Sequence, residues 1–430
     1  MRRRALLAAA GTGLAAGLTG CLSASAPAVG TAWSRQTADA ANTYTTSTEG
    51  PTSDLYRFWQ RELPGNYGPT CSPVVGDGTV YVASGGSPND QPSWTWLGAY
   101  DATTGEPTWE TKLGQTVETA SLHSYADSLV LDRERDRVLV QTRAGLQSVG
   151  ADGSVDWTFE NIGPRQMGPT ALSPVVAEDT VVTATYATTG DSGLEAVFGL
   201  SHDGTERWRV DLPDRTPGQL TAVDGTVYVP SLYGDQKGIL ALDATTGERL
   251  FTWDLPAYGP LSVSNGTAYL PLRDGGVDEL VALDAQDGTA IWRQGVGGRW
   301  PESGLAVADG LVYAIAESSL VVRRAETGEV VWRFGKQSAV TAELQTSPVV
   351  AGGHVYVHGY RNSETDSTVH LFVLDAETGE QRGQVALPQA MSPDSVPAVT
   401  DGLVFSAQRP GSLVAIGECD TQLFGDCVSR

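Results

Sequence analysis

A short sequence phrase recurs along the 430-residue chain, and it constrains the fold more than any other feature. One copy is DATTGEPTW at 101–109. Aligned on its glycine, the phrase returns at positions 105, 153, 204, 247, 288, 328 and 379, with gaps of 48, 51, 43, 41, 40 and 51 residues. An aromatic residue follows four positions later in all copies but the last. Self-similarity at such a period predicts an architecture built from one repeated supersecondary unit.

A second phrase precedes each copy and completes the unit. In SPVVGDGTVYVAS, at 72–84, a short apolar run meets an Asp-Gly turn and then an alternating strand. Asp-Gly and Asn-Gly are favoured in tight β-hairpins, and period-two alternation is typical of a half-buried strand. The glycine of DATTGE suits the positive φ of a second hairpin turn. Each unit therefore predicts four antiparallel strands, which is one blade of a β-propeller.

The two ends of the repeat region predict how the blades close into a ring. Residues 397–417 supply three strands, and the chain then ends without a tryptophan strand. Residues 55–65 contain Trp59, one repeat length before Trp109, with no strands ahead of them. We therefore predict an all-β fold of eight blades over 55–417, in which the N-terminal strand completes the last blade. Seven blades remain the alternative, because the second repeat at 128–142 is weak.

The N-terminus predicts export and a lipid anchor. Arg2, Arg3 and Arg4 precede an apolar stretch that is too short to span a membrane, so 1–20 read as a signal peptide of the twin-arginine type. The sequence LTGC at 18–21 predicts lipidation of Cys21; the alternative is a plain signal peptide with an incidental cysteine. Residues 21–54 are rich in Ser, Ala and Thr, and we expect a flexible tether that holds the domain at the outer face of the cell membrane.

The charge of the chain restricts its partners. The formal net charge is −23, and the only lysines are Lys112, Lys237 and Lys336. An acid-rich, lysine-poor surface is typical of salt-adapted proteins such as those of halophilic archaea; an ordinary acidic exported protein is the alternative. Such a surface cannot neutralise phosphates, so we expect no nucleic-acid partner.

Three cysteines follow the lipidation site, and an exported location permits disulfides. Cys419 and Cys427 bracket a short loop in the tail at 418–430, so we predict that they pair and that Cys71 is a core thiol. A bond from Cys71 to the tail is the competing arrangement.

The combined pattern SPVVxDGxVYV…LxALDAxTGExxW resembles the repeat of the pyrroloquinoline quinone (PQQ) propeller superfamily. One branch contains dehydrogenases that bind PQQ and calcium at the propeller axis, and another contains non-enzymatic lipoproteins of the BamB type. The resemblance implies that the repeated tryptophans dock neighbouring blades, and a large aromatic residue present once per unit agrees with that role. These residues are Trp59, Trp109, Trp157, Trp208, Trp292 and Trp332. The adjacent cysteines of many quinoprotein alcohol dehydrogenases are not present in this sequence.

Residues that interrupt the repeat are the better candidates for function, because a residue type present in every blade cannot mark a single site. The stretch 84–98 carries Trp94 and Trp96, and 295–304 carries Arg299 and Trp300. Exposed aromatic residues with arginine suit a protein or glycan surface, although they could instead cover blade edges. His354 and His358 share a strand face, but no third metal ligand accompanies them.

We therefore predict a membrane-anchored, monomeric scaffold or binding protein without catalytic, cofactor or metal residues. The alternative is a PQQ- and calcium-dependent dehydrogenase of sugars or alcohols. A role in outer-membrane assembly would require an outer membrane, which the salt-adapted composition disfavours.

Overall fold

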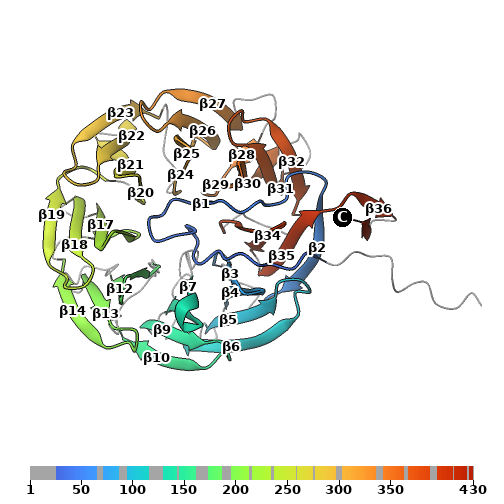
Figure 1. Cartoon of the computed structure of the whole chain (residues 1–430), viewed down its shortest axis with the longest axis horizontal. Helices are drawn as coiled ribbons and strands as arrows, with labels where there is room; N and C mark the ends of the chain where they lie inside the picture. Colours follow the sequence, from blue (N-terminus) through green and yellow to red (C-terminus); the bar gives the residue numbers. More distant parts are fainter. Residues whose placement is uncertain are drawn as a thin grey trace, which may run out of the picture.

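Eight sheets, each built on four antiparallel strands, surround a central axis, as the repeat predicted, and two of the sheets carry additional short strands (Figure 1). The computed structural model describes residues 26–64, 71–86, 94–115, 129–142, 145–160, 173–185, 195–212, 216–233, 237–257, 259–274, 277–296, 303–335, 342–362, 367–387, 395–409, 411–423 and 426–429. Each sheet is one blade. The strands nearest the axis are β3, β7, β11, β16, β20, β24, β29 and β33. We number the blades from the sheet that follows Cys71.

The first four blades are formed by residues 74–253. Blade 1 contains β3 (Val74–Gly76), β4 (Thr79–Gly86), β5 (Trp94–Asp101) and β6 (Pro107–Gln115). Blade 2 contains β7 (Leu129–Asp132), β8 (Arg137–Thr142), β9 (Gly145–Gly150) and β10 (Val155–Phe159), with the 3₁₀ helix η1 (Arg133–Arg135) between its first two strands. Blade 3 contains β11 (Val175–Ala177), β12 (Thr180–Thr185), β13 (Ala196–Leu200) and β14 (Glu206–Asp211). Blade 4 contains β15 (Thr216–Pro217), β16 (Thr221–Val223), β17 (Thr226–Tyr233), β18 (Gly238–Asp243) and β19 (Arg249–Trp253).

The other four blades use residues 262–418 and two N-terminal strands. Blade 5 contains β20 (Ser262–Ser264), β21 (Thr267–Asp274), β22 (Val277–Asp284) and β23 (Ala290–Gly295). Blade 6 contains β24 (Ala306–Ala308), β25 (Leu311–Ala316), β26 (Ser319–Arg324) and β27 (Val330–Gly335). Blade 7 contains β28 (Ala342–Leu344), β29 (Val349–Ala351), β30 (His354–Asn362), β31 (Ser367–Asp375) and β32 (Gln381–Ala386), and β1 (Thr45–Thr46) joins it. Blade 8 contains β33 (Ala398–Thr400), β34 (Leu403–Gln408), β35 (Ser412–Glu418) and β2 (Leu55–Glu62).

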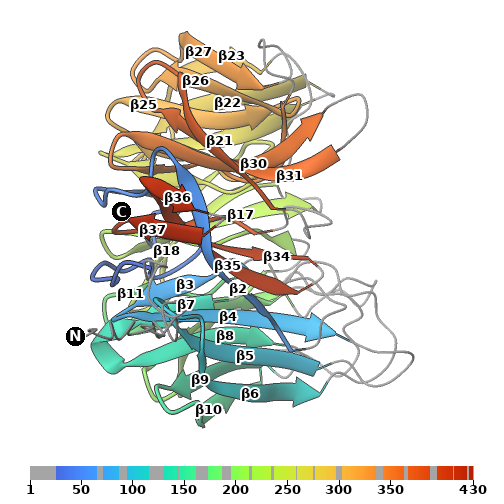
Figure 2. The ribbon, with the colours of Figure 1, turned by 90° about the vertical axis from the view of Figure 1, so that its right-hand side faces the viewer.

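The two repeated phrases build two tight turns in every blade except blades 2 and 8, and both turns lie on the same side of the propeller. In the first turn of blade 1, Asp77 and Gly78 have φ of 49° and 76°, the left-handed values that a two-residue hairpin needs. In the second turn, Oδ1 of Asp101 accepts hydrogen bonds from the N–H groups of Thr103 and Thr104, at 3.0 and 2.8 Å. We call this side the turn face; it lies at the left of Figure 2.

The N-terminal strand closes the ring as predicted. Strand β2 pairs antiparallel with β35, and Trp59 lies opposite Ala415 in the register. The outermost strand of blade 8 therefore comes from the start of the domain and the other three strands from its end. This arrangement ties the chain ends together and leaves no gap between the last blade and the first.

The repeated tryptophans dock each blade on the next, as the sequence indicated. Nε1 of Trp208, for example, donates a hydrogen bond to the carbonyl of Ala244 in blade 4 at 3.1 Å. The indole also covers Gly247, where a Cβ atom would lie 2.6 Å from the ring. Blade 4 departs from the rule, because Trp253 rather than Phe251 covers Gly288 of blade 5. The two rings stack with centroids 5.4 Å apart, so Phe251 supports the tryptophan that replaces it.

The tail confirms the predicted disulfide, which joins Cys419 to Cys427 and leaves Cys71 as a buried thiol. Two short strands, β36 (Thr421–Leu423) and β37 (Asp426–Ser429), pair around this bond. No helix in the described part of the chain is long and apolar enough to span a membrane. The predicted signal peptide and Cys21 lie outside the described residues.

Candidate functional site

The segment expected to be a flexible tether is instead part of the folded domain from Ala26 onward. Residues 26–49, which we call the axial segment, make one circuit around the propeller axis on the turn face (Figures 1 and 2). The circuit begins at blade 8, where the N–H of Asp401 donates to Oγ1 of Thr31 at 3.0 Å. It returns to blade 8, where the N–H of Gly402 donates to the carbonyl of Glu49 at 3.0 Å.

Backbone hydrogen bonds join the axial segment to seven of the eight blades. Their blade residues are Val75, Leu131, Ala222, Val263, Val307, Val350, Gly352 and Gly402, each donating its N–H to a carbonyl of the segment. The innermost strand of every blade except blade 7 has one edge without a strand neighbour in its own sheet, and in blade 7 strand β1 of the axial segment pairs with that edge. Buried backbone groups at such an edge need partners. The axial segment supplies them, which explains how a stretch with few apolar residues becomes ordered.

Two aromatic side chains fix the axial segment in the core. Trp33 and Tyr44 are each 1% exposed. The backbone of Trp33 exchanges two hydrogen bonds with Val75, both 2.8 Å long. The ring of Tyr44 contacts Gly304, which lies just before β24 of blade 6. A Cβ atom at Gly304 would lie 2.2 Å from the hydroxyl oxygen of Tyr44, so only glycine leaves room for the ring.

Asn42 connects the axial segment to two blades through its side chain. It is fully buried and has a left-handed φ of 57°. Its Nδ2 lies 3.1 Å from the carbonyl of Leu220, 2.6 Å from Oγ1 of Thr221 and 3.1 Å from the carbonyl of Leu261. Leu220 and Thr221 belong to blade 4, and Leu261 leads into blade 5. One buried amide therefore holds two neighbouring blades and the axial segment together.

The weak second repeat contains a second departure from the pattern. Instead of a two-residue turn, blade 2 carries residues 132–136, with sequence DRERD, folded around η1. Arg133 points back to blade 1, where its Nη2 lies 2.8 Å from Oδ1 of Asp77. Arg137, at the start of β8, points forward and lies 2.9 Å from the buried carboxylate of Asp132. The insertion thus links three consecutive blades through charged side chains.

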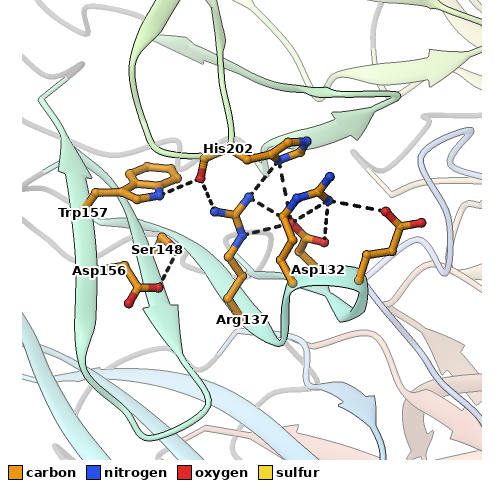
Figure 3. Close-up of polar contacts among 8 residues, drawn as sticks. Asp132, Arg137, Ser148, Asp156, Trp157 and His202 are labelled. Carbon is orange, nitrogen blue, oxygen red and sulfur yellow. Dashed lines mark hydrogen bonds and ion pairs between the residues drawn. The ribbon is translucent and has the colours of Figure 1, made fainter.

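The forward contact is a compact cluster around His202 of blade 3 (Figure 3). Nη2 of Arg137 lies 2.9 Å from Nδ1 of His202, and the same guanidinium bonds the His202 carbonyl. Trp157 donates its Nε1 hydrogen to that carbonyl at 3.0 Å, and the guanidinium carbon lies 5.7 Å from the Trp157 ring centroid. A guanidinium only donates, so Nδ1 accepts and the imidazole hydrogen is on Nε2.

Burial and neighbouring positive charges lower the pKa of His202. Burial lowers its pKa most, and the positive charges of Arg135 and Arg137 lower it further, outweighing the opposite effect of Asp132. Because Arg137 occupies Nδ1, this nitrogen is not available to take a proton from a substrate. The geometry therefore favours a structural role in which the cluster fixes blade 3 against blade 2.

The backward contact borders a cleft of about 200 Å³ between blades 1 and 2 on the turn face. Its wall includes Asp77, Arg133 and Asp136 together with the rings of Tyr81 and Trp109. The two rings have centroids 6.0 Å apart. Trp109 also performs its docking role here, donating Nε1 to the carbonyl of Ala151 at 2.6 Å. Such a cleft has the size and polarity to admit a small polar molecule.

Comparison with known proteins agrees with this architecture. A family model described as outer membrane protein assembly factor BamB matches residues 20–197, 185–277 and 277–421. The chain belongs to this family. The resemblance to a PQQ-like propeller with BamB-type relatives is thereby confirmed. No curated protein matches the sequence significantly.

Solved structures share the fold of this BamB-family chain at low sequence identity. BamB from Moraxella catarrhalis is 17% identical, with a TM-score of 0.58, and the match covers 86% of this chain and 99% of that one. A quinohemoprotein alcohol dehydrogenase from Comamonas testosteroni is 15% identical, with a TM-score of 0.65 and coverage of 90% and 80%. A europium-containing methanol dehydrogenase is 13% identical, with a TM-score of 0.66 and coverage of 90% and 98%. At these identities the matches show the fold alone.

The superfamily resemblance raises the question whether the axis of this BamB-family chain fits PQQ and calcium. On the turn face the axial segment encircles the axis. The polar groups there include the buried guanidinium of Arg35 as well as amides and hydroxyls; Ser262 Oγ, for example, donates to the carbonyl of Asn42 at 2.7 Å. Among the described residues, no three His, Cys, Asp or Glu side chains gather where they could hold a metal ion. The described axial residues do not fit the group, and we derive no chemistry through it.

The predicted binding surface is only partly described. Trp94 begins β5, but its side chain is outside the described part, as are Arg299 and Trp300. Trp96 is half-buried, and Nζ of Lys112 on β6 lies 5.7 Å from its ring centroid. This contact places Trp96 against the outer strand of its own blade. The proposed contribution of these residues to binding stays a prediction.

His354 and His358 lie on one strand, β30, as expected, but they have separate surroundings. His358 is 1% exposed and lies between the carbonyl of Ser395 and the hydroxyl of Ser406, each 3.0 Å away. Burial lowers the pKa of His358 to about 4. Nδ1 of His354 contacts the carbonyl of Gly352 at 3.1 Å. Both imidazoles make hydrogen bonds within the protein.

Sequence reasoning missed the axial segment and the role of the second-repeat insertion. Composition alone suggested a tether, but Trp33 and Tyr44 are unusual in a flexible linker and could have signalled burial. The run of alternating charges at 132–137 marked a weak repeat, and no pattern indicated which blades its arginines contact.

Proposed function

We propose that the protein is an extracytoplasmic lipoprotein, anchored through Cys21, that acts as a scaffold for a protein or glycan partner without catalysis. Membership of the BamB family and the signal sequence with its LTGC motif support this assignment. The observation that carries most weight is the axial segment. It encircles the turn-face end of the axis with the chain's own backbone, and among the described residues no three His, Cys, Asp or Glu side chains gather where they could hold a metal ion.

The lipid anchor is tested by detergent phase partitioning of the protein from its own cells. We expect the wild type to enter the detergent phase and Cys21→Ser to enter the aqueous phase or the medium. Equal partitioning of the two would contradict the anchor. Crosslinking in intact cells followed by purification then tests the scaffold role, with Trp96→Ala as the variant and Gln286→Ala on the turn face as the control. Loss of a crosslinked partner in the first variant alone is the expected result.

The similarity to two alcohol dehydrogenase folds supports one alternative function, that of a PQQ- and calcium-dependent dehydrogenase. Titration of the purified chain with PQQ in the presence of calcium, followed by absorbance, tests this alternative directly. Saturable binding together with dye reduction on sugars or alcohols would favour the dehydrogenase over the scaffold.

We further propose that the protein works at high salt, as in a haloarchaeal cell surface. Its net charge of −23 makes the carboxylates repel one another, and salt screens that repulsion. We expect the melting temperature to rise between low and molar KCl. A melting temperature that is independent of salt would contradict this adaptation.

A further inference from the structure

We propose that the propeller is held with its turn face toward the membrane and its opposite face toward the partner. This inference rests on the proposed lipidation of Cys21. It follows from where the axial segment docks and from how little chain separates that docking point from the lipid. The surface that approaches the lipid is therefore the turn face.

The domain-side end of the anchor is fixed on the turn face, at the first turn of blade 8. Ala26 and Val29 are 5% and 7% exposed, so the chain is already buried at the first described residues. Gly402, in the first turn of blade 8, faces Pro27, and the N–H of Asp401 bonds Oγ1 of Thr31 at 3.0 Å. From there Trp33 is held against blade 1 by two backbone hydrogen bonds. A pull on the N-terminus therefore acts on the turn face.

The remaining connection to the lipid is short. Only five residues of chain lead from Cys21 to Ala26, and fully extended they span about 18 Å. A free tether over 22–54 would have an r.m.s. length of about 32 Å, whereas a domain of this size has a radius of gyration of about 21 Å. The connection of about 18 Å is too short to pass around the domain, so the opposite face cannot turn toward the lipid. A free tether of about 32 Å would be long enough to allow that orientation.

Charge does not attract this face to lipid, so geometry must set the orientation. Exposed carboxylates stand on the turns of several blades: Asp224, Glu248, Asp309, Glu329 and Asp401. Against anionic headgroups these groups repel, over a distance of about 8 Å at 0.15 M salt and about 3 Å at 1 M. We therefore expect the face to approach the membrane more closely as salt rises, without inserting into it.

The orientation is tested with two matched fluorescent labels and an acceptor dye in the lipid. Gln286→Cys places a label on an exposed turn of blade 5, and Lys237→Cys places one on an exposed residue at the opposite end of blade 4. The two faces are separated by strands such as β17, with eight residues, which span about 26 Å. In vesicles from the producing cells we expect strong energy transfer from the first label and weak transfer from the second. Equal transfer, or the reverse order, would overturn the proposal.

A third variant separates docking from anchoring. Insertion of 30 Gly/Ser residues between Ser25 and Ala26 keeps the lipid site and the axial segment but lengthens the connection. We expect this insertion to abolish the difference between the two labels. A difference that persists would show that something other than the short connection orients the domain. Detergent partitioning of the same samples distinguishes the failures: soluble protein refutes the anchor, and anchored protein with equal labels refutes only the orientation.

Discussion

Replacement of Asn42 by alanine tests whether the axial segment stabilises the propeller. The substitution removes the amide that contacts Leu220, Thr221 and Leu261 and leaves buried acceptors of two blades without this donor. The amide carries two hydrogens, so the substitution removes two hydrogen bonds, each worth about 1 kcal/mol. Alanine in a left-handed conformation adds about 1 kcal/mol. We expect Asn42→Ala to lower the free energy of unfolding by about 3 kcal/mol in total.

Asn265 provides a control that isolates the backbone contribution. It lies in the first turn of blade 5, is exposed, and has φ of 50°, close to the 57° of Asn42. Asn265→Ala therefore carries the same conformational penalty of about 1 kcal/mol without a buried amide. The difference between the two variants, about 2 kcal/mol, measures the hydrogen bonds of Asn42.

Differential scanning calorimetry of the mature chain at constant salt is a suitable assay. An unfolding entropy of about 2.1 cal/mol/K per residue gives about 0.8 kcal/mol/K for roughly 400 residues. The melting temperature should then fall by about 4 °C for Asn42→Ala and by about 1 °C for Asn265→Ala. Equal shifts in the two variants would refute the idea that the axial segment holds blades 4 and 5 together.

Three further predictions concern the blades. Gly247→Ala, whose Cβ would lie 2.6 Å from the docking indole, should lower the melting temperature clearly more than Gly266→Ala, which has a similar φ and nothing within 4 Å; equal effects would show that docking is not tight. Burial lowers the pKa of His358 to about 4, so between pH 6.5 and 4 only the unfolded state binds this proton, and stability should fall by up to ~3 kcal/mol as pH drops through that window. His358→Gln should lose that part of the pH dependence in denaturation curves, and an unchanged curve would contradict the assignment. Arg137→Ala should lower the free energy of unfolding by about 3 kcal/mol, because the buried carboxylate of Asp132 then keeps only its longer contact with Arg135, at 3.3 Å. The double variant Asp132→Ala, Arg137→Ala should cost less than the sum of the single variants, and strict additivity would contradict the pairing.

The number and closure of the blades were predictable because they depend on local patterns. The spacing of Gly105, Gly153 and their equivalents counts the blades, and the position of Trp59 one repeat before Trp109 identifies the closing strand. The docking role of the tryptophans was predictable for the same reason. Phe251 shows the limit of that reasoning, because the neighbouring Trp253 takes over its contact with blade 5. The repeat pattern predicts which face of the strand contacts the next blade. The packing of the folded protein determines which of the two aromatic residues on that face makes the contact.

The functional assignment depended on contacts that no local pattern records. The order of residues 26–49 arises because eight innermost strands meet at the axis and expose backbone groups there. A stretch of Ala, Ser and Thr looks like a linker when only its own side chains are considered, since these bury little apolar surface. Its stability comes from hydrogen bonds to residues up to 370 positions away, such as that from Asp401 to Thr31.

The sequence by itself determined the blade, the number of blades and the way the propeller closes, because turns, strand alternation and the docking tryptophan are encoded within each repeat of about 40 to 50 residues. The tertiary structure alone decided what lies at the axis and which face is joined to the N-terminus. The physical reason is that the innermost strand edges are brought together around one axis only after all the blades have assembled. The partner of that edge, residues 26–49, is then selected by geometry and hydrogen bonding rather than by any motif of its own.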